Sequence, residues 1–122
     1  MNADEFNALT AEGVADILDA AAAHIERFGW IQDDYYELGR PATKCGVCSM
    51  GAINVAMFGH PSPPKDVMAY FATCEVGGLV LKRLGVLGID LAAWNDEAHR
   101  TQDDVTTAMR ETAAELRQEA AS

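Results

Sequence analysis

The spacing of apolar residues along the chain predicts helices and no strands. From Thr10 to about Phe28, apolar residues recur every three to four positions and would form one stripe along a helix. We expect Thr10 to cap the start of this helix and Gly29 to end it. A further short turn of helix is expected over Ala3–Leu9. The stripe consists of Val14, Ile17, Leu18, Ala21, Ile25 and Phe28.

A second helix follows an irregular segment. Residues Trp30–Thr43 combine charged, aromatic and turn-forming residues without a period, which is typical of a loop. The second helix is expected over Cys45–Phe58, where apolar and small residues share one face and Gly59 follows. Its small residues favour a close crossing with another helix.

A third helix is predicted over Lys65–Leu84, with Ser62 as its N-cap and Pro63 at its first position. Apolar residues surround it almost completely, which is typical of a central helix. The pair Gly77–Gly78 is a point at which it can kink. Cys74 is expected to be a structural thiol on a buried face.

The last part of the chain predicts a single turn over Leu91–Trp94 and a final helix over Thr101–Ala120. Thr101 is the expected cap of that helix. Arg110 and Arg117 are expected on its solvated face beside its own glutamates.

These elements define the fold class. We expect one all-α domain spanning residues 1–122, a compact bundle of four main helices with short extra turns. The ends, 1–9 and 119–122, are expected to fray.

Composition and charge narrow the function classes. A net charge of −10 disfavours binding to nucleic-acid phosphates or anionic membranes, but it permits a basic protein partner or mimicry of a nucleic acid. No apolar run approaches the length of a membrane span, and the start of the sequence is acidic, unlike a secretory signal. We therefore expect a cytoplasmic protein that does not bind membranes.

The cysteines suggest two kinds of thiol chemistry. The three cysteines are expected to be free in a reducing compartment. Cys45 and Cys48 are spaced as in a redox dithiol at a helix start, but no strand precedes them. Zinc is the other option, through Cys45, Cys48, His60 and Cys74, although the last two do not form a second ligand pair.

Cys48 is also the candidate catalytic nucleophile. Such a cysteine needs a base and an oxyanion donor. His99 is the best placed base, because it follows Asp96 by three residues, whereas His24 is expected to face outward. Gln32 and Asn95 could assist if the loops converge.

The sequence Trp94-Asn95-Asp96 has two interpretations. The tryptophan can fill the core while the Asn and Asp side chains bond to turn backbone, and Arg100 can pair with Asp96 or another carboxylate. Alternatively, this segment lines a pocket for a small ligand or peptide. That pocket would be formed by Trp30, Gln32, Trp94 and Asn95.

Residues 33–37, which combine acidic side chains with two tyrosines, are a candidate interaction surface. Tyrosines are frequent anchors in protein interfaces. A solvated loop with two tucked rings is the alternative. The segment consists of Asp33, Asp34, Tyr35, Tyr36 and Glu37.

Three short motifs stand out: Trp30-x-Gln32, Cys48-x-x-Gly51-Ala52, and Trp94-Asn95-Asp96 followed by Arg100-Thr101. Together they resemble an uncharacterised family of small proteins found mostly in actinobacteria and their phages. The resemblance covers about Val14 to Leu116 and implies a shared scaffold with no established activity. Because the family pattern requires neither Cys45 nor His99, the resemblance weakens the dithiol and Cys–His interpretations.

The leading functional hypothesis is a non-enzymatic protein-interaction module, in which a phage protein would modulate a host protein. The alternative is a small-ligand-binding protein or a cysteine-dependent enzyme that uses Cys48 with Gln32 and Asn95/Asp96. A nucleic-acid-mimicking inhibitor is the third. No cofactor is expected, and the chain could be a monomer or a homodimer.

Overall fold

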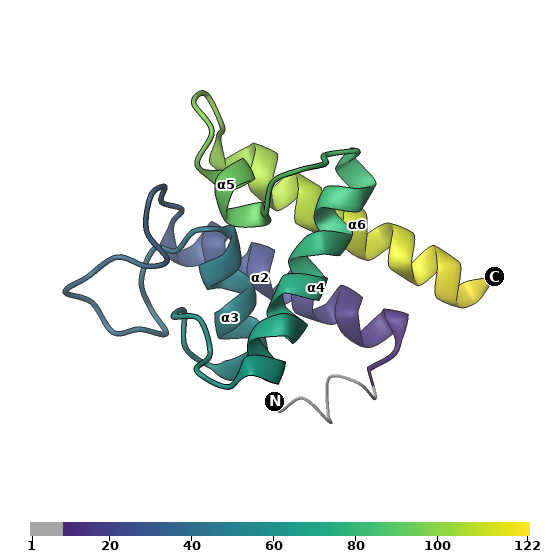
Figure 1. Cartoon of the computed structure of the whole chain (residues 1–122), viewed down its shortest axis with the longest axis horizontal. Helices are drawn as coiled ribbons and strands as arrows, with labels where there is room; N and C mark the ends of the chain where they lie inside the picture. Colours follow the sequence, from purple (N-terminus) through teal and green to yellow (C-terminus); the bar gives the residue numbers. More distant parts are fainter. Residues whose placement is uncertain (1–8) are drawn as a thin grey trace.

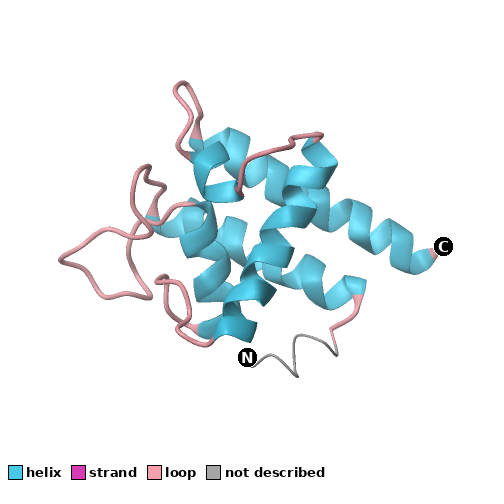
Figure 2. Ribbon diagram, viewed as in Figure 1, coloured by secondary structure: helices cyan, strands magenta, loops and turns pink. Residues whose placement is uncertain are grey.

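The computed structural model describes residues 9–122, and this part of the chain is all-α, with five helices and no strand (Figures 1 and 2). The predicted fold class is therefore confirmed. The turn of helix expected over Ala3–Leu9 falls outside the described residues except for Leu9. The helices are α2 (Ala11–Phe28), α3 (Ser49–Phe58), α4 (Val67–Leu84), α5 (Leu91–Asn95) and α6 (Gln102–Ala121).

Helix α2 contributes seven buried residues to the core. Its predicted stripe is buried except for half-buried Phe28, and it packs most extensively against α6 and next against α3. In Figure 1, α2 lies behind α3 and α4. As predicted, the Thr10 hydroxyl caps the helix by accepting from the Gly13 amide, and the chain leaves the helix at Gly29, where φ is 109°.

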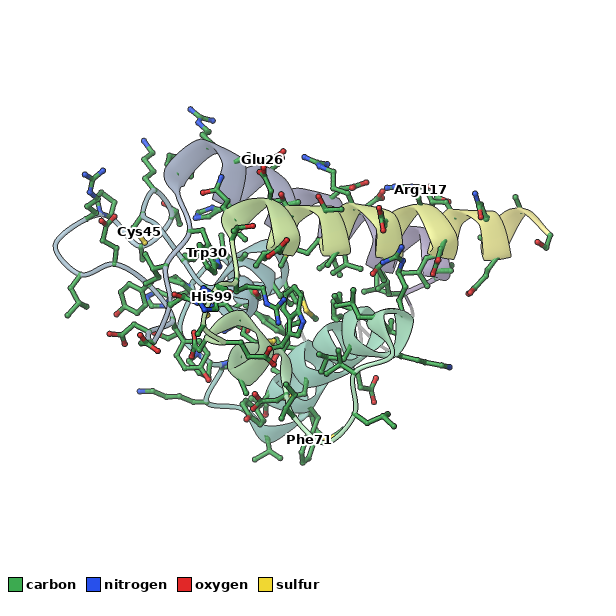
Figure 3. The ribbon with its side chains drawn as sticks, turned by 90° about the horizontal axis from the view of Figure 1, so that it is seen from above. Glu26, Trp30, Cys45, Phe71, His99 and Arg117 are labelled. Atoms are coloured by element: carbon green, nitrogen blue, oxygen red, sulfur yellow. The ribbon has the colours of Figure 1, made fainter. Side chains whose placement is uncertain are left out.

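Ion pairs join α2 to α6 along their outer edges. The Arg117 guanidinium lies 2.6 Å from an Asp19 carboxylate oxygen and 2.7 Å from one of Asp16. Arg110 pairs with Asp19 and Glu26. Figure 3 shows Glu26 and Arg117 along this edge. Both arginines thus pair with carboxylates of α2, which lie directly opposite them, and not with the glutamates of their own helix.

Helix α3 begins at Ser49 and not at Cys45, so the predicted start is wrong. The backbone groups before Cys48 are already bonded to the preceding loop. The Val47 amide donates to the Gly29 carbonyl at 3.2 Å, and the Val47 carbonyl accepts from the Ile31 amide at 3.0 Å. These bonds hold the chain extended, and α3 can start only once they end, with Cys48 as its N-cap.

Helix α4 begins at Val67 with Asp66 as its N-cap, so Ser62 and Pro63 do not start it. The prediction of a central helix is also wrong. One face packs against α3, α5 and α6, but the first turns leave four large apolar side chains exposed. Cys74, expected to be buried, is exposed. The helix continues without a break through Gly77 and Gly78.

The last two helices match their predictions. The single turn over Leu91–Trp94 is α5, which extends to Asn95. The Thr101 side chain caps α6, and Asp104 completes a reciprocal capping box by accepting from the Thr101 amide at 3.0 Å.

Gly51 allows the loop before α3 to pass close to that helix. A Cβ atom at this position would lie 2.1 Å from the Tyr35 carbonyl oxygen. That same oxygen accepts a hydrogen bond from the Cys48 amide at 3.2 Å, so it cannot move away without breaking the bond. Gly78 differs, because nothing lies within 4 Å of a Cβ built there.

We therefore predict opposite effects for two glycine-to-alanine substitutions in helices. Gly51→Ala should lower the free energy of unfolding by about 3 kcal/mol or more, because the clash is with backbone. Gly78→Ala should raise it by about 1 kcal/mol through helix propensity. Urea denaturation followed by circular dichroism measures both. If the two substitutions changed the free energy of unfolding equally, the loop would not approach α3 as described.

Candidate functional site

The buried side chain of Asn95 joins three parts of the chain. Its Oδ1 accepts from Trp30 Nε1 at 2.7 Å, from the Ser49 amide at 2.9 Å and from Ser49 Oγ at 2.5 Å. Its Nδ2 donates to the Ile31 carbonyl at 3.1 Å and to Asp96 Oδ1 at 2.9 Å. Because indole and amide N–H groups can only donate, they identify the amide oxygen unambiguously.

Two further bonds tie the loop after α2 to the end of α5. Gln32 Nε2 donates to the carbonyls of Asn95 and Glu97, both at 3.0 Å. The Asp33 amide donates to Asp96 Oδ1 at 2.8 Å. Asp33 adopts a left-handed φ of 71°, which turns the chain at this point.

Trp94 and Arg100 form the other side of this region. Trp94 is 5% exposed, and the central carbon of the Arg100 guanidinium lies 4.0 Å from the centroid of its ring. Arg100 Nε donates to the Trp94 carbonyl at 3.0 Å, and Nη2 pairs with Glu97 at 2.8 Å. Glu97, and not Asp96, is therefore the carboxylate partner of Arg100.

The structure thus brings together most of the residues predicted to line a pocket, but their polar atoms bond to one another. We refer to Trp30, Gln32, Ser49, Asn95 and Asp96 as the Asn95 cluster. The Asn95 side chain has no hydrogen-bonding capacity left for a ligand. Ser49 was missed in the sequence, where a small residue beside a cysteine gives no signal of its own.

The two cysteines of the CxxC pair are buried and hold local structure. Cys48 Sγ accepts from the Gly51 amide at 3.3 Å, and Cys45 Sγ donates to the Ala42 carbonyl at 3.5 Å. Burial raises the pKa of the Cys48 thiol to about 11, despite the lowering effect of nearby backbone amides. A thiol in this state is a poor nucleophile near neutral pH.

The histidines do not meet Cys48. His99 is exposed at a left-handed turn and is not among the residues lining the hollow beside Cys48. His60 is exposed, with its Nδ1 accepting from the Ser62 amide. His24, expected to face outward, is half-buried, and its Nε2 lies 2.9 Å from the Cys45 carbonyl.

The four candidate zinc ligands are not gathered into one site. Across residues 9–122, no three His, Cys, Asp or Glu side chains lie close enough together to hold a metal ion.

Two hollows lie side by side near the Asn95 cluster. The first, of about 270 Å³, is here named the acidic hollow. The second, of about 110 Å³ between α3, α4 and α5, is named the apolar hollow. Tyr35 and Ala92 line both hollows. The acidic hollow is lined by Asp33, Asp34, Tyr35, Cys48, Ala92 and Asp96.

The beginning of α4 presents an apolar face to the outside. Its members are 42–62% exposed, and Figure 3 shows Phe71 pointing away from the body of the molecule. Tyr70 also lines the apolar hollow, so this face and the hollow are continuous. The α4 apolar face consists of Val67, Met68, Tyr70 and Phe71.

The predicted interaction segment, residues 33–37, is linked to this face through Tyr35. Asp33 and Asp34 are exposed, whereas Tyr35, Tyr36 and Glu37 are half-buried. Tyr35 connects the segment to α4, because it lines the apolar hollow together with Tyr70. Burial, followed by the neighbouring Tyr70, raises the pKa of the Tyr35 hydroxyl, which therefore remains neutral at physiological pH.

Comparison with known proteins identifies the family. Residues 9–115 match a family of unknown function, DUF6197, and the chain belongs to it. No curated protein and no solved structure gives a significant match. Within residues 9–122, no helix has both the length and the apolar character needed to cross a membrane.

The three thiols should differ in reactivity. We predict that iodoacetamide at neutral pH modifies exposed Cys74 and spares Cys45 and Cys48 until the protein unfolds. At this pKa, the thiolate fraction of Cys48 is about a hundredfold below that of a thiol with a pKa of 9.0. Mass spectrometry of intact and digested protein measures the sites. Rapid labelling of Cys48 in the folded state would revive the nucleophile hypothesis.

We also predict that Asn95→Leu lowers the free energy of unfolding by about 3 kcal/mol or more, because it leaves several buried donors without an acceptor. Gln32→Ala is the matched control. It should cost about 1 kcal/mol, because the bond to the Glu97 carbonyl is exposed and the bond to the Asn95 carbonyl is only partly buried. Urea denaturation gives both values, and a loss below 1 kcal/mol for Asn95→Leu would contradict the structural role.

Proposed function

We propose that this protein is a non-enzymatic interaction module that binds a basic partner protein. The observation behind the proposal is the α4 apolar face, where four large side chains stay exposed in a small domain. Contiguous exposed apolar side chains with a polar rim are typical of protein-binding surfaces. Met, Tyr and Phe are also the residue types enriched at such interfaces.

Charge supports a basic partner. The carboxylates of α2 that face α6 are engaged by Arg110 and Arg117. Asp33 and Asp34 are instead exposed, and they precede Tyr35, which lines the apolar hollow together with Tyr70 of the α4 apolar face. A partner with Lys or Arg around an apolar anchor would complement this arrangement. A second copy of this chain would bring another net charge of −10 and is therefore disfavoured.

The other hypotheses receive less support. A cysteine-dependent enzyme would need a reactive Cys48, and its pKa of about 11 argues against that. The alternative pocket around Gln32 and Asn95 is filled by mutual hydrogen bonds. Mimicry of a nucleic acid needs unpaired carboxylates in a row, but many of those along α2 and α6 are in ion pairs.

The setting of the interaction is also a proposal. The three short motifs resemble proteins of actinobacteria and their phages, which supports a phage protein that modulates a host protein in the cytoplasm. An actinobacterial lysate is therefore the appropriate source of partners.

We predict that changing the α4 apolar face abolishes partner binding. Tagged wild-type protein and the Met68→Ser/Phe71→Ser variant should be compared by quantitative affinity capture. Leu87→Ser is the matched control, because Leu87 is 90% exposed but lies outside the face. We expect wild type and Leu87→Ser to capture the same basic proteins in equal amounts. The double variant should capture at least tenfold less of each. Scrambling residues 33–37 should also abolish this capture while leaving the helicity, measured by circular dichroism, unchanged.

Three outcomes would contradict the proposal. Captured proteins that the double variant still retains would place the interface elsewhere. Partners without a basic character would remove the charge argument. A wild-type dimer that the double variant converts to a monomer, measured by native mass spectrometry, would assign the α4 apolar face to a second copy of the chain.

A further inference from the structure

The apolar hollow contains a buried polar atom that no protein group satisfies. Asn54 is 1% exposed and lines the hollow. Its Nδ2 donates to the Pro61 carbonyl at 2.9 Å, which leaves Oδ1 as the free end of the amide, and this oxygen has no hydrogen-bond partner. A buried acceptor without a donor is costly, so such an atom calls for an explanation.

Other polar side chains at the hollow are already committed within the protein. Thr73 Oγ1 donates to the Tyr70 carbonyl at 2.8 Å. Asp90 Oδ1 accepts from the Ala93 amide at 2.8 Å and so caps α5. The oxygens of Tyr35, Tyr70 and Asp90 also line the hollow, but these residues are half-buried or exposed, so water can reach them. Among the described residues, Asn54 Oδ1 is thus the buried side-chain oxygen at the hollow that lacks a partner, and most of the remaining lining is apolar.

Two glycines of α4 give the hollow its shape. Gly77 lets α4 approach α3 and α5, since a Cβ there would lie 2.9 Å from Met50 Sδ and 3.4 Å from Leu91 Cβ. Gly78 also lines the hollow, and a Cβ there would meet nothing within 4 Å. Thus one glycine permits close packing, and the next leaves the space empty.

We propose that the apolar hollow is a binding site for a small neutral molecule consisting of a single ring with one O–H or N–H donor. An apolar cavity of about 150 Å³ accommodates benzene. The hollow is smaller, at about 110 Å³, but it opens to the surface, so a single ring can enter it with one edge still outside. The donor would bond to Asn54 Oδ1, and the ring would contact Met50, Leu81 and Leu91.

This inference does not rest on the proposed function, because its evidence is the Asn54 side chain and the glycines of α4 and not the exposed side chains of the α4 apolar face. Phenol and toluene form a matched pair of probes, because they have nearly the same shape and only phenol carries a donor.

The experiment is a titration of the full-length protein with each probe, followed by two-dimensional ¹H–¹⁵N NMR. We expect phenol to shift the amide signals of residues lining the hollow, and to bind roughly three- to tenfold more tightly than toluene because of one added hydrogen bond. Gly78→Leu should place a side chain in the hollow and weaken both probes at least tenfold. Gly78→Ala, which leaves most of the space, should bind nearly as wild type does.

Asn54→Leu tests the acceptor. It should remove the preference for phenol while toluene still binds. The Gly78 variants keep the site testable if Asn54→Leu does not fold, because they change no polar contact. Circular dichroism checks the fold of each variant.

Three results would overturn the proposal. Shifts that are absent, or that lie away from the hollow, would exclude the site, and water alone would then satisfy Asn54 Oδ1. Equal affinities of phenol and toluene in wild type would exclude the role of Asn54. Tighter binding of N-acetyl-tyrosinamide than of phenol would assign the hollow to a protein side chain and not to a free molecule.

Discussion

One amide oxygen holds the α2–α3 loop of this protein against α5. Asn95 Oδ1 accepts from the indole of Trp30 and from both donors of Ser49, and these residues lie 65 and 46 positions away in the sequence. The loop after α2, the start of α3 and the end of α5 meet at this single atom. The position of the α2–α3 loop, and with it both hollows, depends on this contact.

The helices whose local signals agree with their packing could be predicted from the sequence. In α2 and α6 the apolar period, the capping threonine and the buried stripe all give the same answer. The start of α3 could not be predicted, because extended backbone bonds to Gly29 and Ile31 decide it. The burial of α4 could not be predicted either, since apolar residues all around a helix do not reveal which side has a neighbour.

The candidate site, too, could be predicted from the sequence only in part. The sequence singled out Trp30, Gln32 and Asn95 as unusual polar and aromatic residues, and they do meet, but they bond to one another. The apolar hollow had no comparable signal. The hollow depends on the missing side chain at Gly78 and on Asn54 of α3. Neither residue indicates a cavity until α3, α4 and α5 are placed together.

The long sequence separation of the bonds at Asn95 has a consequence for local unfolding. The α2–α3 loop contains no helix to hold its shape. Its hydrogen bonds to Asn95 and Asp96, at the end of α5, join residues 63 to 65 positions apart in the sequence. The loop therefore cannot detach while α5 remains docked without breaking the bonds of the Asn95 side chain to Trp30 and Ile31. These two segments, distant in the sequence, should open as one cooperative unit, and the amides of Ile31 and Ser49 should exchange with solvent hydrogen at a common free energy.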